Sequence, residues 1–268
     1  MSATISARRR TAVAVLTAAL ALGGAACGPL DDDAKPSKSS KSTAKAKGGS
    51  ASGSEPFAGQ SGPDVVNKAV RATKTATSLT LDIALKSADG PTKGRLSINT
   101  KGECAGTLSL GATGTAELIK TGKTAYMRFD EAFLREQGKG EPAEETEAVL
   151  KMLKGRWVET DVSDPDSKES LELCDLNSLL AELEANDNAA RRAGEATVDG
   201  HKALKLTESD GDATYTLYVA AEGQPYLLKF EQVGGDEPGT FTFSKFNEPV
   251  GAKRPAAKDI LDLDELGQ

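Results

Sequence analysis

Four extended segments joined by turn residues lie between residues 197 and 249, and they constrain the fold more than any other feature. The segments are residues 203–206, 215–219, 226–230 and 240–244. The turns between them contain Asp210 with Gly211, Gly223, and Gly234 with Gly235. Such residues tolerate the backbone angles of tight turns. The pattern therefore predicts consecutive antiparallel strands, as in a meander.

A second group of strands is predicted upstream, because residues 79–86 alternate strictly between apolar and polar side chains. Alternation with a period of two is typical of a strand with one buried face. The apolar members of this stretch are Leu79, Leu81, Ile83 and Leu85. Shorter strands follow as far as Arg128, which gives a first meander of about five strands.

The apolar spacing changes to nearer four residues between Asp130 and Asn186, which predicts helices between the two meanders. Asp130 is suited to cap the first of them. The apolar residues of the three predicted helices are Phe133 with Leu134, then Val149, Leu150 and Leu153, then Leu176, Leu179, Leu180 and Leu183. We also expect a short strand at Trp157, an amphipathic helix from Pro63, and a helical turn after Pro255.

Strands followed by helices and then strands, each with one apolar side, predict the α+β class. We expect a curved antiparallel sheet, an open half-barrel, with the helices covering its concave face. A fully closed barrel fills its interior with its own side chains, so the helical insertion argues against closure. The chain has 268 residues, and we expect residues 63–268 to form its single domain.

The N-terminal 26 residues have the anatomy of an export signal, with three arginines, an apolar run and small residues. Thr11 and Ala12 follow the arginines, so we prefer general secretory export to twin-arginine export. Cys27 comes directly after the small residues, in a pattern that resembles a bacterial lipobox. We therefore expect an acylated (palmitoylated) Cys27 that anchors an extracytoplasmic protein to the cell membrane. The alternative is a plain secretory signal that leaves Cys27 unused.

Residues 27–62 should form a disordered tether, because they are rich in Lys, Ser, Ala and Gly and poor in large apolar side chains. The lysines between Lys35 and Lys47 are placed to contact lipid headgroups. The whole chain has 33 basic and 40 acidic residues and a net charge of −7. This balance argues against nucleic acid as a partner, and against a domain that lies flat on anionic lipid.

Few residues suggest chemistry. Cys104 and Cys174 should pair as a disulfide in an exported protein, and a redox site would need a closer spacing. His201 is the only histidine, so no histidine-based triad is available, and we interpret it as a solvated turn residue. The alternating acids Glu208, Asp210 and Asp212 indicate a charged hairpin tip and not a calcium loop. We predict no enzyme activity, catalytic residue, metal or cofactor.

The remaining candidate site is the apolar concave face itself. Its predicted lining residues are Leu79, Leu81, Ile83, Leu85, Tyr215, Leu217, Tyr226, Leu228 and Phe243. Plain core packing is the alternative at each position, because alternation does not distinguish a filled interior from a hollow one.

The second half of the chain resembles the LolA/LppX-like superfamily of bacterial lipoproteins and lipid carriers. The resemblance lies in residues 198–206, 215–230 and 241–250, and residues 155–158 are similar to that family's central strand. It implies a half-barrel whose cavity holds acyl chains. We therefore expect a membrane-anchored lipoprotein that binds or carries a lipid or lipoglycan. The alternative is a cavity-less scaffold or sensor that contacts another envelope protein.

Overall fold

The computed structural model describes residues 56–87, 90–164, 171–183, 189–235 and 238–261. All of them fall within one compact unit of the chain, Ser52–Gln268. The predicted signal peptide, Cys27 and most of the predicted tether lie outside the described residues. Residues 56–61, which we expected to belong to the tether, precede the first helix, and their backbone is bound by Arg192.

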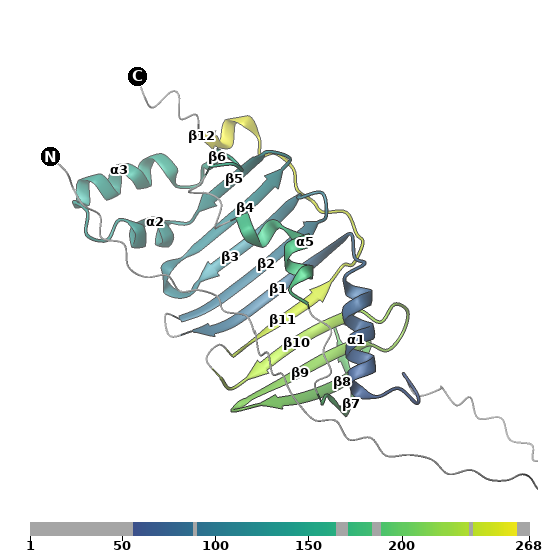
Figure 1. Ribbon diagram of the computed structural model, residues 1–268. Coiled ribbons are helices and arrows are strands. Elements are labelled where there is room, and N and C mark those ends of the chain that lie inside the picture. Colours follow the sequence, from purple (N-terminus) through teal and green to yellow (C-terminus); the bar gives the residue numbers. More distant parts are fainter. Residues whose placement is uncertain (1–55, 88–89, 165–170, 184–188, 236–237, 262–268) are drawn as a thin grey trace, which may run out of the picture. The chain divides into compact units, whose positions relative to one another are not determined.

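One sheet of twelve strands forms the framework, in the order β12-β6-β5-β4-β3-β2-β1-β11-β10-β9-β8-β7 (Figure 1). Its first five strands are β1 (Ser78–Ser87), β2 (Gly90–Asn99), β3 (Cys104–Leu110), β4 (Thr115–Thr121) and β5 (Thr124–Phe129). The others are β6 (Trp157–Asp161), β7 (Arg191–Val198), β8 (His201–Asp210), β9 (Ala213–Ala220), β10 (Leu227–Val233), β11 (Gly239–Ser244) and β12 (Ile260–Leu261). Neighbouring strands are antiparallel, except that β12 runs parallel to β6.

The register gives the sheet one apolar side. Leu81 of β1 lies opposite Leu96 of β2 and Phe243 of β11. The intervening polar residues point the other way, where Arg95 donates to both carboxylate oxygens of Asp82 at 2.8 Å. The alternation predicted for β1 is therefore confirmed, and it extends across the two meanders because β1 pairs with β11 and joins them.

Two helices cover this apolar side (Figure 1). Helix α1 (Gly62–Thr73) packs on β9, β10 and β7, and α5 (Leu176–Ala181) packs on β1 and β2. Helix α1 begins with a capping box in which the Ser61 side chain and the Asp64 side chain each bind the other's backbone N–H. Its buried side is the one predicted from the sequence, with Val66, Ala69, Val70 and Thr73.

Helices α2 (Glu131–Gln137) and α3 (Ala143–Leu153) form a hairpin at the β4–β5 side of the sheet (Figure 1). The Phe133 backbone N–H donates to Asp130 Oδ1 at 2.8 Å, so the predicted cap is confirmed. Leu150 is buried, as expected, but Val149 is 38% exposed. The predicted apolar side of α3 is therefore narrower than we inferred, because only α2 and the adjacent strands face it.

The α+β class, with a curved antiparallel sheet that does not close, is confirmed. Two strands were not predicted: β7, and β12, which directly follows the short helical turn η3 (Ala257–Asp259). Strand β6, which contains Trp157, lies one strand from the edge of the described sheet and not at its centre. Pairing of β7 with β8 is irregular, with a register shift between Arg192 and Glu195.

Replacing Thr73 by valine should lower the stability of the fold. The Leu227 backbone N–H donates to Thr73 Oγ1 at 2.9 Å, and these residues are 3% and 0% exposed. Valine keeps the shape but removes the acceptor, so we expect Thr73→Val to cost about 1–3 kcal/mol of unfolding free energy. Urea denaturation checks this, with Thr75→Val, at an exposed position of the same segment, as the control. Equal effects of both substitutions would contradict the assignment.

Candidate functional site

The apolar side of the sheet carries two packed clusters, one beneath each covering helix. Val65, Val66, Ala69 and Val70 of α1 pack with residues of β8, β9 and β10. Leu176 and Leu180 of α5 pack with residues of β1, β2 and β3. Phe243 and Leu183 contact both clusters. The two helices therefore cover one continuous apolar face.

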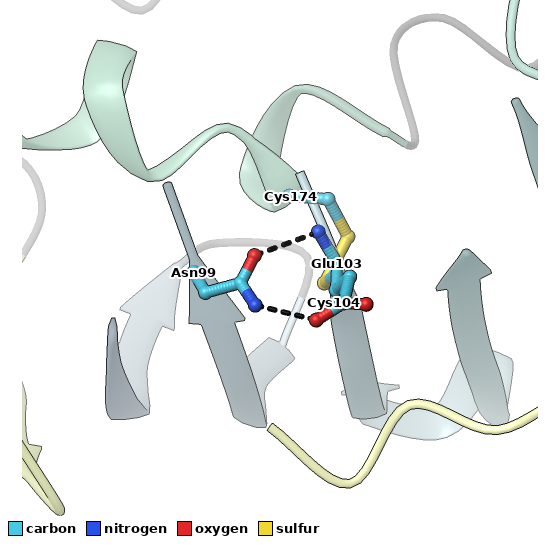
Figure 2. The surroundings of a disulfide bond; sticks show 4 residues. All are labelled: Asn99, Glu103, Cys104 and Cys174. Carbon is cyan, nitrogen blue, oxygen red and sulfur yellow. Dashed lines mark hydrogen bonds between the residues drawn. A yellow bond between two sulfur atoms is a disulfide. The ribbon is translucent and has the colours of Figure 1, made fainter. Parts of the chain in front are cut away.

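A disulfide joins the α5 segment to the sheet, as predicted (Figure 2). It links Cys104, at the start of β3, to Cys174, and the two Cα atoms are 5.4 Å apart. Neither cysteine is exposed. The Asn99 side chain shapes the adjacent turn, because its Oδ1 accepts from the Glu103 backbone N–H at 2.9 Å and its Nδ2 donates to Glu103 Oε2 at 2.6 Å. The cover above β2 and β3 is thus held covalently.

The cap of α5 should be lost in acid. Hydrogen bonds from the Ser178 hydroxyl, and from the backbone N–H groups of Ser178 and Asn177, lower the pKa of Asp175 below its usual value of 3.8. A depressed pKa contributes stability that is present above the usual value and is lost as pH falls through the folded value. We expect Asp175→Ala to cost about 1 kcal/mol at pH 7 and less as the pH falls toward 2. Urea denaturation at both pH values measures this. A cost that does not depend on pH would contradict it.

Some large side chains on the apolar face are not fully buried but remain partly exposed to solvent. Leu85, Leu108, Tyr215, Phe230 and Phe241 form what we call the apolar strip. The register connects them, because Phe241 lies opposite both Ile83 and Phe230, and Phe230 lies opposite Leu217. The ring centroids of Tyr215 and Phe230 are 5.7 Å apart, and those of Phe230 and Phe241 are 6.2 Å apart. A contiguous apolar surface therefore crosses both meanders.

The strip lies toward the end of the face that α5 and the C-terminal end of α1 do not cover. Cys104 and Leu227, which fix the two helical covers, are the first residues of β3 and β10. Tyr215 lies near the opposite end of β9, the neighbour of β10. Leu85 lies near the opposite end of β1, which is separated from β3 by β2.

Two glycines on this face leave no hollow. A Cβ atom built on Gly94 would lie 3.0 Å from Leu108 Cδ1, and one built on Gly239 would lie 2.5 Å from Leu85 Cδ2. The space that each glycine leaves is therefore filled by a leucine of the adjacent strand.

The predicted pocket residues do not all lie together. Those on the helix-covered side are Leu79, Leu81, Ile83, Leu85, Tyr215, Leu217 and Phe243. Tyr226 and Leu228 belong to a separate cluster on the other side of the sheet, with Val198, Ala203 and Ala220. Phe230 and Phe241 were not predicted. The alternation of Phe241 with Phe243 was the signal for Phe241.

A hollow of about 270 Å³ lies between β4, β5, the start of α2 and the residues that follow α3, and its lining includes the charged residues Glu117, Arg128 and Lys154. Glu117 and Arg128 form a two-point ion pair there, with distances of 3.1 and 2.7 Å. Hydrogen bonds from Lys154 and Arg135 lower the pKa of Glu131. Because charged side chains line so much of it, the hollow does not resemble an acyl-chain site. The predicted apolar cavity stays a prediction.

Other candidate chemistry finds little support in the described part of the chain. Within it, no group of His, Cys, Asp or Glu side chains is arranged to hold a metal ion. His201 is an exposed first residue of β8, next to the Asp199–Gly200 turn. Glu208 and Asp210 lie near the end of the same strand. Across the described ranges, no helix has the length and apolarity to cross a membrane.

This chain is similar to several proteins of known structure. No family model matches the chain, and no curated protein is similar in sequence. LprF from Mycobacterium bovis is 12% identical, with a TM-score of 0.48, over 73% of this chain and 97% of that one. The lipoprotein LppX from Mycobacterium tuberculosis is 15% identical, with a TM-score of 0.44, over 71% and 97%.

A third similar structure is that of the MucA/MucB complex of Pseudomonas aeruginosa, at 14% identity and a TM-score of 0.35, over 74% of this chain and 62% of that one. The fold class itself rests on the strand order and register of this chain.

Proposed function

We propose that this protein is an extracytoplasmic lipoprotein, anchored to the cell membrane through acylated Cys27, that binds an acyl-chain-bearing lipid along the apolar strip. Binding involves no covalent chemistry, and the ligand is a lipid or a lipoglycan. The apolar strip is the observation that carries this proposal. Leu85, Phe230 and Phe241 are large apolar side chains that remain partly exposed beside two well-packed clusters.

The hydrophobic effect would supply the affinity. Each methylene group of a ligand that leaves water contributes about 0.8 kcal/mol. Adjacent strands are about 4.8 Å apart, so a ligand that crosses from β3 to β9 along the strip would lie over roughly 25 Å of sheet. A long acyl chain fits this distance better than a compact apolar molecule.

A scaffold or sensor that contacts another envelope protein is the second candidate. The observation that favours it is the filling of the Gly94 and Gly239 positions by Leu108 and Leu85. A face closed by its own side chains would leave no place for a ligand. The partner would then meet the charged opposite side of the sheet, which carries the Arg95–Asp82 ion pair.

Extraction of the purified protein with organic solvent, followed by mass spectrometry, distinguishes a lipid-binding protein from a scaffold. We expect an amphiphile with at least one long acyl chain, at a reproducible molar ratio to the protein. Native mass spectrometry should show the same added mass on the folded chain. A ligand-free protein that also fails to take up a fluorescent fatty acid would favour the scaffold.

A further inference from the structure

The solvent side of α1 is basic, although the protein as a whole is acidic. Lys68, Arg71 and Lys74 are exposed along one side of the helix and its C-terminal end, and we call them the basic stripe. Asp64, the one acidic residue of α1, is engaged in the capping box with Ser61. The chain has 40 acidic against 33 basic residues. The exposed side of α1 is therefore positive, although the net charge of the chain is −7.

The chain from Cys27 also reaches the domain beside this helix. Arg192 of β7 donates hydrogen bonds to the carbonyl oxygens of Pro56, Phe57 and Gln60, immediately before α1. A Cβ atom on Gly62 would lie only 1.9 Å from the Ala190 carbonyl oxygen, so α1 begins in direct backbone contact with the segment that enters β7. The point where the tether joins the domain is thus firmly packed.

The net charge argues against a domain that lies flat on anionic lipid, but it does not describe the local charge of α1. We propose that the basic stripe alone docks the domain on the surface of an anionic lipid bilayer. Lys68 and Arg71 would approach the phosphate-bearing headgroups, and Lys74 would extend the contact. Charge complementarity and the position of the tether junction both favour this partner. The inference goes beyond the proposed lipid binding, because it assigns a second lipid contact to a different surface.

Weak attraction is sufficient for this role. Each basic residue near an anionic membrane strengthens attachment by about fivefold. An anchored domain is already concentrated at the membrane, so such a contact needs only to select its orientation. Helix α1 lies on the same side of the sheet as the apolar strip, because Phe230 packs against the cluster beneath α1. Docking through α1 would therefore turn the strip toward the bilayer, where lipids are available.

Vesicle sedimentation tests the proposal with the full mature chain carrying Cys27→Ser, so that no acyl group contributes. The vesicles contain one part phosphatidylglycerol to two parts phosphatidylcholine, at low salt. We expect Lys68→Gln with Arg71→Gln to weaken binding by roughly 25-fold. The matched control removes the same charge as Lys93→Gln with Lys101→Gln, at exposed positions of β2 and the β2–β3 turn. It should change binding by about twofold or less.

The proposal is overturned if both pairs weaken binding equally, which would indicate an effect of net charge. It is also overturned if the α1 pair has no effect, because the tether lysines would then be sufficient. Binding should fall with added salt and be lost on pure phosphatidylcholine vesicles. The acyl-lipid content of each variant is measured separately, so failure of membrane docking and failure of the proposed function remain distinguishable.

Discussion

Replacing Cys104 and Cys174 together by alanine should lower the free energy of unfolding by about 4 kcal/mol, the largest stability change that we expect. The disulfide joins residues separated by 70 positions, and its loss frees that whole loop in the unfolded chain. Alanine avoids placing serine hydroxyls at positions that are 0% exposed. Urea denaturation of the purified variant measures the change.

In the folded state, loss of the disulfide should affect mainly the segment around α5. We expect hydrogen exchange to become faster in α5, whose Leu176 and Leu180 side chains cover β1 and β2, with little change in α1. The oxidised and chemically reduced wild-type protein provides a control without any substitution. A loss below about 1 kcal/mol, or equal acceleration in both helices, would contradict a role for the disulfide in holding this cover.

Replacing Leu85 and Phe241 together by glutamine should weaken binding of a fluorescent fatty acid by roughly thirtyfold, or about 2 kcal/mol. Both side chains belong to the apolar strip and are partly exposed. Glutamine removes apolar contact surface and places polar groups where an acyl chain would lie. Fluorescence titration of the probe measures the affinity.

The matched control is Lys86→Gln with Thr242→Gln, because each residue directly follows a strip residue and points to the other side of the sheet. It should leave the affinity within about twofold of the wild-type value. Thermal unfolding of both variants separates loss of binding from loss of folding. Equal weakening by the two pairs, or none by either, would be evidence against a ligand on the strip.

The sequence predicts the centre of the fold well because its signals there are local and regular. Leu79 to Leu85 alternate without interruption, and Asp130 stands directly before a helical apolar pattern. The disulfide followed from the export signal and the number of cysteines. In each case the pattern reflects one physical requirement: a buried strand face, a capped helix end, or paired cysteines in an exported protein.

The edges were harder to predict, because edge strands need few apolar residues. Strand β7 has the sequence of an exposed segment, with Arg191, Arg192 and Glu195, and it buries only Val198 fully. Strand β12 has two residues and pairs in parallel with β6, over a long sequence separation. Neither strand shows a local pattern that distinguishes it from a loop.

Tyr226 and Leu228, two of the predicted pocket residues, lie where the period of the strand is interrupted. The pairing of β10 with β9 shifts between Leu227 and Lys229. Leu227 and Phe230 therefore both face α1, although they are three residues apart, while Leu228 turns to the other side. Counting alternate residues across such a bulge assigns every later side chain to the wrong side.

The irregular pairing of β7 affects how readily two copies of the protein can associate through their sheet edges. An exposed strand edge offers unsatisfied backbone groups to any neighbouring chain. The register shift between Arg192 and Glu195, with Gly194 at φ 101°, interrupts that edge in its middle. If the protein is anchored as we propose, its copies meet one another repeatedly in the plane of the bilayer. An irregular, charged edge strand would hinder edge-to-edge pairing between neighbouring molecules and so limit aggregation.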